Sequence, residues 1–184
     1  MSVEPVIRFC AVISADAELR EAAIERLTKA WGEVFLQSEP LPFEAGGYYA
    51  ETMGPELKKT LIAFHEPVDG ASLADWKLWT NNVEREFHGT RAGLLRPVNL
   101  DPGYVTQAKL VLATTKDRDH RLYLRDGIFA EITLNYTAKR WVHHRWSYPD
   151  YRTEAVAEFA MRCRNRLRES LQATDGMRRR ETSS

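Results

Sequence analysis

A short segment in the second half of the chain combines hydroxyl, ammonium and guanidinium side chains. Thr114, Thr115 and Lys116 are followed closely by His120 and Arg121. Phosphate sites use hydroxyl donors, a compact ammonium charge and a planar guanidinium that converge on one group. The segment therefore favours an anion site, with Thr114, Thr115, Lys116 and Arg121 as ligand-binding residues. The alternative is a solvated connection whose charges pair with one another, each exposed pair contributing about 0–1 kcal/mol.

Two polar residues upstream, Asn99 and Asp101, lie between an expected strand and an expected helix. Asn99 would add an amide to the ligand-binding group, and Asp101 could act as a base beside Lys116. The structural alternative is that Asp101 caps the helix, which contributes about 1 kcal/mol.

Glu131 shares one face of an expected strand with Phe129, Thr133 and Asn135, opposite an apolar face. Across a hairpin, Glu131 can meet His120. A carboxylate there would orient the histidine or serve as a general base, so His120, Glu131 and Asp101 are the catalytic candidates. An ordinary cross-strand charge pair is the alternative for Glu131.

Other chemistries lack the residues that they need. The adjacent His143 and His144 would point to opposite faces of a strand, and no cluster has the spacing of metal ligands. Cys10 lies in an apolar run, and no G-x-S-x-G motif is present. We expect no metal, no cofactor and no serine or cysteine nucleophile.

Aromatic and basic residues interleave near the C-terminal end, as they do in platforms that stack single-stranded bases. They are Lys139, Arg140, Trp141, His143, Arg145, Trp146, Tyr148 and Tyr151. The glycine and aromatic consensus of RNA-recognition sheets is absent, and aromatic residues more often pack in a core. Nucleic-acid or protein binding through this half is the alternative function.

The elements that would position these residues begin with the order βαββαβ. Asp16 caps the first helix and Gly32 ends it, while Ser72 and Asp75 form a capping box for the second. This order is typical of the ferredoxin-like fold, with both helices on one face of an antiparallel sheet. The expected strands are 6–14, 33–37, 58–66 and 94–100.

The rest of the chain predicts additions to this opening. Asp101 and Pro102 begin a short helix, and Asp126-Gly127 forms the tight turn of a β-hairpin. A strand at 140–146 and a last helix from Pro149-Asp150 follow. The expected fold class is α+β: a ferredoxin-like opening with an added short helix, C-terminal β-hairpins and a C-terminal helix. We expect one domain at 1–173 and a polar, disordered tail at 174–184.

The composition fits an ordinary globular domain, with 184 residues, 26 Lys+Arg, 26 Asp+Glu and two cysteines. Residues 1–98 carry 10 Lys/Arg and 15 Asp/Glu, whereas residues 99–184 carry 16 and 11. The basic excess therefore gathers in the half that holds the candidate site. No apolar run reaches the ~18 residues of a membrane span, and the start lacks a secretory signal. We expect a cytoplasmic protein without membrane contact, and two buried free thiols. The oligomeric state stays open.

Three stretches carry a family resemblance. Val98 to Tyr136, WSYPDYR (146–152) and YYAETMG (48–54) resemble the bacterial domain-of-unknown-function family 4416 over most of the chain. The resemblance implies little about function, because that family is uncharacterised. Some similar proteins carry a GTP-binding label, but the sequence has no G-x-x-x-x-G-K-[ST] loop. Arg118 also stands where an N/T-K-x-D motif needs aspartate.

These observations together predict a binding protein. A phosphorylated or other anionic small molecule, such as a nucleotide, would bind between the Asp101 helix and the Asp126-Gly127 hairpin. Whether a reaction follows binding is left open by the sequence.

Overall fold

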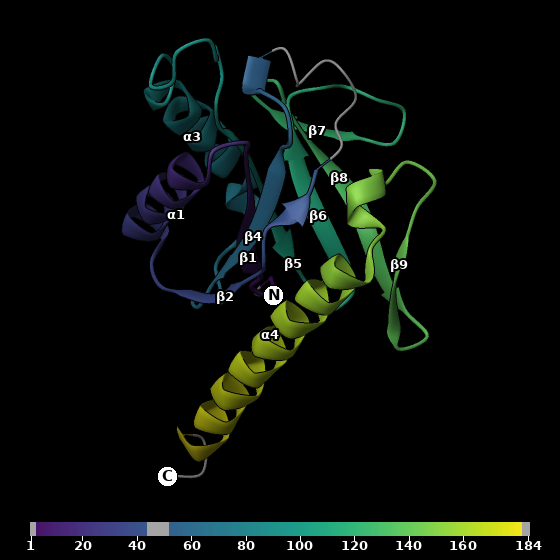
Figure 1. Ribbon diagram of the computed structural model, residues 1–184. Helices are drawn as coiled ribbons and strands as arrows, with labels where there is room; N and C mark the ends of the chain where they lie inside the picture. Colours follow the sequence, from purple (N-terminus) through teal and green to yellow (C-terminus); the bar gives the residue numbers. More distant parts are fainter. Residues whose placement is uncertain (1–2, 44–51, 182–184) are drawn as a thin grey trace.

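A computed structural model of the protein describes residues 3–43 and 52–181 (Figure 1). Its centre is a nine-stranded antiparallel sheet in the order β2-β4-β1-β5-β6-β8-β7, with β3 paired to β4 and β9 paired to β8. The strands are β1 (Ile7–Ser14), β2 (Val34–Gln37), β3 (Leu41–Pro42), β4 (Lys58–Phe64), β5 (Asn99–Val105), β6 (Lys109–Thr114), β7 (Leu122–Arg125), β8 (Ile128–Thr137) and β9 (Arg140–His143). The mixture of helices with this sheet confirms the α+β class.

Long helices cover both faces of the sheet (Figure 1). Helices α1 (Ala17–Trp31) and α3 (Leu73–Glu86) pack on one face, and α4 (Glu154–Glu181) packs on the other. Strand β1 is apolar on both sides for this reason: Cys10 and Val12 contact the α1 and α3 side, whereas Phe9 and Ala11 contact the α4 side. Both cysteines are buried and free, as expected.

Only one of the two helix starts expected in the βαββαβ opening agrees with the structure. Asp16 caps α1, since its Oδ1 accepts from the backbone N–H of Glu18 at 2.9 Å and of Leu19 at 3.1 Å. The capping box expected at Ser72 is wrong, because Ser72 makes no side-chain cap hydrogen bond. A 3₁₀ turn, η1 (Gly70–Ser72), precedes α3, and Asp69 caps that turn.

The short helix expected from Asp101 is also wrong, because residues 99–114 form the hairpin β5–β6. Asp101 is therefore a strand residue and not an N-cap, and the strand expected at 94–100 lies at 99–105. Gly103 permits the close packing of this hairpin: an added Cβ would lie 2.3 Å from the Val111 carbonyl oxygen and 2.7 Å from the Phe9 ring.

Strands β5 and β6 pair over only part of their lengths. Pairing runs from Val105 with Leu110 to Gly103 with Leu112. Beyond that point, Asn99 to Pro102 pair with β1, while Ala113 and Thr114 pair with β8. Pro102 has no N–H to donate to a neighbouring strand. The sheet therefore opens between β5 and β6 at the end that carries Asn99, Asp101 and Thr114.

The β7–β8 hairpin agrees with the turn expected at Asp126-Gly127. Asp126 and Gly127 have φ values of 51° and 74°, as a tight hairpin turn between β7 and β8 requires. Strand β9 ends at His143, three residues earlier than expected. The last helix also begins later, because Pro149–Tyr151 forms a 3₁₀ turn, η2, before α4.

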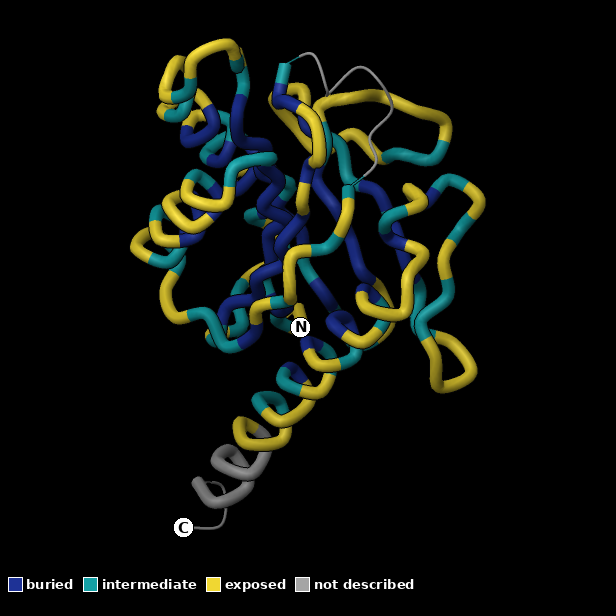
Figure 2. The backbone as a smooth tube through the Cα atoms, in the orientation of Figure 1, coloured by how far each residue is buried: buried dark blue, intermediate teal, exposed yellow. Residues whose placement is uncertain are grey.

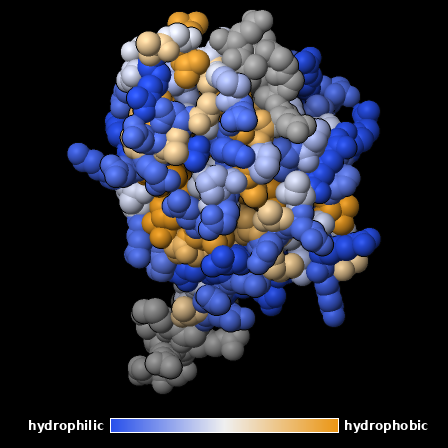
Figure 3. Space-filling model, in the orientation of Figure 1, coloured by the Kyte–Doolittle hydropathy of each residue, from blue (hydrophilic) through white to orange (hydrophobic). Residues whose placement is uncertain are grey.

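Burial follows the layers of the fold. The central strands are buried, whereas the outer hairpins and the outward faces of the helices are exposed (Figure 2). The face seen in Figure 3 is mainly hydrophilic, with hydrophobic patches interrupted by polar residues. Within the described ranges, no helix has the length and apolar character that crossing a membrane demands. The division into a domain at 1–173 and a tail at 174–184 stays a prediction, and residues 182–184 lie outside the described chain.

Candidate functional site

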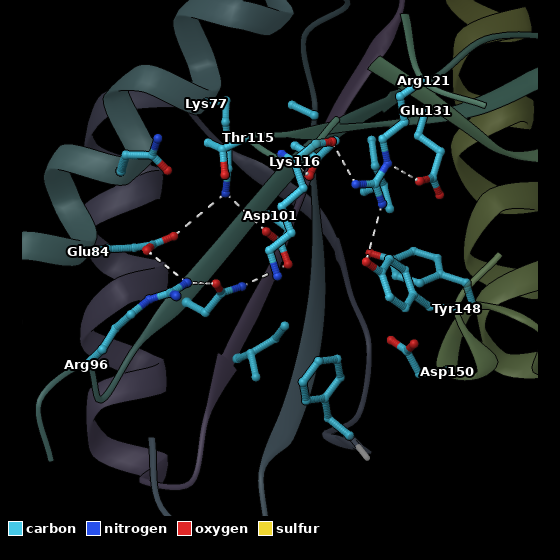
Figure 4. Close-up of a pocket in the computed structure, with 18 of the residues that line it drawn as sticks. Lys77, Glu84, Arg96, Asp101, Thr115, Lys116, Arg121, Glu131, Tyr148 and Asp150 are labelled. Carbon is cyan, nitrogen blue, oxygen red and sulfur yellow. Dashed lines mark hydrogen bonds and ion pairs between the residues drawn. The ribbon is translucent and has the colours of Figure 1, made fainter. Parts of the chain in front are cut away.

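A cavity of about 760 Å³ lies where β5 and β6 separate, bordered by α3, β8 and the segment from Tyr148 to Tyr151 (Figure 4). Seven of the eight candidate residues line it, although they come from β5, β6, β8 and the loop after β6. They are Asn99, Asp101, Thr114, Thr115, Lys116, Arg121 and Glu131. The eighth, His120, does not line the cavity but contacts Glu131.

Five side chains form a closed set of contacts on the α3 side, named here the charge ring: Lys77, Glu84, Arg96, Asn99 and Asp101 (Figure 4). The Lys77 ammonium lies 3.1 Å from Asp101 Oδ1 and 3.8 Å from Glu84 Oε1. Arg96 lies 3.2 Å from Glu84 Oε2 and donates to Asn99 Oδ1. Asn99 Nδ2 in turn donates to Asp101 Oδ2 at 2.8 Å. The ring therefore holds two cations against two carboxylates.

Burial changes the electrostatics of the charge ring. Burial of the Lys77 ammonium lowers its pKa, but Asp101 and Glu84 outweigh this effect, so the pKa of Lys77 is raised overall. Burial raises the pKa of Glu84, although Lys77 and Arg96 oppose the shift. Among Lys77 and its two carboxylate partners, Asp101 is the most accessible. Its side chain is 35% exposed, whereas the side chains of Lys77 and Glu84 are 6% and 8% exposed.

On the opposite side of the cavity, Arg121 and Glu131 form a buried ion pair. Their side chains are 4% and 2% exposed, and Arg121 Nε donates to Glu131 Oε2 at 2.8 Å. The guanidinium also donates to the Lys116 carbonyl oxygen at 2.8 Å and to the Tyr148 hydroxyl at 3.3 Å. Burial lowers the pKa of Arg121, but the contacts with Glu131 and Tyr148 outweigh it and raise the pKa overall. Arg121 thus holds the backbone of the loop after β6.

Glu131 is occupied by its neighbours. It contacts His120 Nε2 at 3.1 Å through Oε2, and its Oε1 accepts from the Thr133 hydroxyl at 3.3 Å. The cross-strand charge pair that the sequence left open for Glu131 fits this geometry. The hydrogen bonds of Asp101, by contrast, go to Lys77 and Asn99, so the three catalytic candidates fall into two separate groups.

The Thr114–Lys116 segment is an accessible cationic part of the cavity wall. Thr115 and Lys116 are exposed, and the Thr114 hydroxyl accepts from the Lys116 backbone N–H at 3.2 Å. This turn and the bond from Arg121 to the Lys116 carbonyl fix the loop at the open end of β6.

Sequence reasoning missed the contribution of α3 and of the η2 turn. Lys77, Asn81, Glu84 and Arg85 line the cavity at the spacing of one helix face. The spacing of these polar residues on one helix face is the signal in the sequence that could have found them. Nothing in the sequence pairs Lys59 with Asp150, whose contact spans 91 positions.

Lys59 and Asp150 form a second buried pair behind the cavity. The Lys59 ammonium is completely buried, lies 2.6 Å from Asp150 Oδ2 and lies 3.8 Å from the centre of the Tyr151 ring. Burial lowers the pKa of Lys59, although the contacts with Asp150 oppose the shift. Asp150 and Tyr151 themselves line the cavity, so this pair fixes part of its wall.

The aromatic residues near the C-terminal end do not form an open stacking platform. The Trp146 ring stacks with the His120 ring, with 5.1 Å between ring centres, and with the His144 ring, with 4.6 Å between ring centres. Trp141 is half-buried and Tyr151 is buried, which leaves Tyr148 as the exposed ring among these four. Across residues 3–43 and 52–181, no group of three or more His, Cys, Asp or Glu is placed to hold a metal ion.

Fold and site together define an α+β protein. Over the residues that the structure describes, it has a large antiparallel sheet with a charged cavity where two strands separate. The chain belongs to the family described as Domain of unknown function (DUF4416), whose model matches residues 4–167. Comparison with curated proteins and with solved structures yields no match.

Proposed function

We propose that the cavity binds a phosphorylated or otherwise anionic small molecule. The observation that carries this proposal is the Thr114–Lys116 segment, which offers hydroxyl groups and an ammonium on one fixed loop of the cavity wall. Hydroxyl donors and a lysine are common partners of phosphate oxygens.

The size and the charge of the cavity support the proposal. Its volume, about 760 Å³, lies within the range of about 300–1,000 Å³ typical of small-molecule sites. Its lining carries one more cation than carboxylates: Lys77, Arg85, Arg96, Lys116 and Arg121 against Glu84, Asp101, Glu131 and Asp150. An anionic ligand would balance this excess in a partly enclosed site.

Two finer assignments belong to the same proposal. The elements β1, α1, β2, β4, α3 and β5 have the strand order β2-β4-β1-β5, and this supports a ferredoxin-like description of the opening. The buried free thiols support a reducing, cytoplasmic location.

Isothermal titration with inorganic phosphate and small phosphomonoesters tests the proposed function. Lys116→Ala should weaken binding about tenfold or more, because a charge-assisted hydrogen bond contributes about 1.5–3 kcal/mol. Lys29→Ala is the matched control, since Lys29 is exposed on α1 and does not line the cavity. Affinity for these probes should also change little with salt, whereas binding of single-stranded RNA would fall steeply.

Two results would overturn the proposed function. One is the absence of saturable binding by any phosphorylated probe. The other is equal binding by the Lys116→Ala and Lys29→Ala variants, which would place the bound anion elsewhere.

A further inference from the structure

We propose that the ligand is a phosphorylated polyol or sugar, whose hydroxyl groups are recognised by Asp101 and Asn81 while its phosphate lies at the Thr114–Lys116 segment. This inference rests on the proposed function and adds the chemical class of the ligand. It follows from the groups that the α3 side of the cavity presents.

Asp101 presents an acceptor that is only partly used. Asn99 Nδ2 donates to one of its oxygens at 2.8 Å and Lys77 Nζ lies 3.1 Å from the other. A carboxylate has about four lone-pair sites, so each oxygen can accept a further hydrogen bond. The side chain is 35% exposed and lines the cavity, which makes those sites reachable.

The cations near Asp101 favour a neutral ligand group over a charged one as the hydrogen-bond donor to this carboxylate. Lys77 already compensates this carboxylate, and Arg96 lies close by through Asn99. A ligand ammonium bound to Asp101 would meet a second ammonium at short range, which is unfavourable in a partly buried site. A neutral hydroxyl donates to the carboxylate without that repulsion.

Asn81 supplies a second polar group on the same wall. It follows Lys77 by one helical turn and lines the cavity. In the part of the chain that the structure describes, the side-chain amide of Asn81 forms no hydrogen bond. This half-buried amide offers both a donor and an acceptor, which matches a hydroxyl group in either role.

The strand separation places the two kinds of group on opposite sides of one opening. Asp101 belongs to β5, and the Thr114–Lys116 segment ends β6 and continues beyond it. In Figure 4, Asp101 lies between the rest of the charge ring and the group formed by Arg121 and Tyr148. One small molecule that carries a phosphate and neighbouring hydroxyls would therefore reach both sets.

The test compares matched phosphate esters by isothermal titration on the full chain. The probes are glycerol 3-phosphate and ribose 5-phosphate, n-propyl phosphate, which lacks hydroxyls, and 2-aminoethyl phosphate, which carries an ammonium. We expect both hydroxylated esters to bind about tenfold or more tightly than n-propyl phosphate, and 2-aminoethyl phosphate to gain nothing over it.

Variants then test whether Asn81 and Asp101 cause the preference for hydroxylated esters. Asn81→Ala should lower the ratio of glycerol 3-phosphate to n-propyl phosphate affinity several-fold and leave n-propyl phosphate affinity nearly unchanged. Asn165→Ala is the control, because Asn165 is exposed on α4 and does not line the cavity. Asp101→Asn should lower the same ratio further. Asn81→Ala removes no hydrogen bond of the folded protein, so it keeps the test valid even if Asp101→Asn fails to fold.

The outcomes separate the two proposals. If no ester binds, the proposed function fails. If n-propyl phosphate binds in a Lys116-dependent manner and the hydroxylated esters bind no better, the polyol inference is overturned while the proposed function stands. Tighter binding of 2-aminoethyl phosphate than of glycerol 3-phosphate would also overturn the inference.

Discussion

The Arg121 guanidinium donates to the Glu131 carboxylate at 2.8 Å, and both side chains are almost completely buried. The same guanidinium holds the carbonyl oxygen of Lys116, a residue of the proposed phosphate segment. Arg121 therefore links the centre of β8 to the loop after β6. It positions the Thr114–Lys116 segment, and its own charge is already compensated by Glu131.

We expect Arg121→Ala to lower the free energy of unfolding by about 3–5 kcal/mol, because it leaves the buried Glu131 charge without its main partner. Arg118→Ala, at an exposed position of the same loop, should change it by about 0.5 kcal/mol or less. Urea denaturation measures both. Similar values for the two variants would mean that the ion pair does not stabilise the fold.

Gly103→Ala should destabilise the protein more than an ordinary glycine replacement. Its Cβ would lie 2.3 Å from the Val111 carbonyl oxygen and 2.7 Å from the Phe9 ring, so the hairpin β5–β6 would have to shift. We expect a loss of about 3 kcal/mol or failure to fold, because overpacking against backbone cannot relax through a rotamer change.

Gly89→Ala is the comparison for Gly103→Ala. Gly89 has positive φ but no atom within 4 Å of an added Cβ, so its replacement should cost only about 1 kcal/mol. Thermal unfolding should give a lower melting temperature for Gly103→Ala than for Gly89→Ala. Equal melting temperatures would contradict the close packing described for Gly103.

The sequence predicts those parts of the fold in which local signals and tertiary structure agree. Asp16 and Gly32 mark the ends of α1, and Asp126-Gly127 marks the β7–β8 turn, because each signal acts on its own neighbours. Asp101-Pro102 also resembles a helix start, but pairing of β5 with β1 overrides that local preference. Val105, Ala108 and Leu112 also have the spacing of one helix face, but Val105 lies in β5, Leu112 lies in β6 and Ala108 lies in the turn between them.

The candidate site shows the same limit. Thr114, Thr115 and Lys116 are adjacent in the chain, so their shared place on the cavity wall could be expected from the sequence. The contacts of Asp101 with Lys77 and of Asp150 with Lys59 join residues 24 and 91 positions apart. Such contacts depend on strand order and register, which composition and spacing do not determine.

Gly127→Val should destabilise the protein by about 1–2 kcal/mol, because Gly127 has φ of 74°, a conformation that β-branched residues adopt only with strain. Gly127→Asn is the control, since asparagine tolerates this conformation. An added Cβ would meet no atom within 4 Å, so the effect would come from the backbone alone. Chemical denaturation should rank wild type first, Gly127→Asn second and Gly127→Val last. Equal midpoints for the two variants would contradict this explanation.

Asp16 should contribute to the pH dependence of stability in the acid range. A hydrogen bond from Arg91 lowers the pKa of the Asp16 carboxyl below its usual 3.8, and the backbone N–H groups of Leu19 and Glu18 lower it further. A carboxyl whose pKa is lower in the folded state stabilises the fold above the unfolded-state pKa, and this contribution disappears as the pH falls through the folded-state pKa. Asp16→Asn retains an N-cap side chain but cannot ionise. Its free energy of unfolding, measured by urea denaturation from pH 6 to pH 2, should therefore lie below that of the wild type at pH 6 and approach it near pH 2. A difference between the two proteins that stays constant over this range would show that ionisation of Asp16 does not stabilise the start of α1.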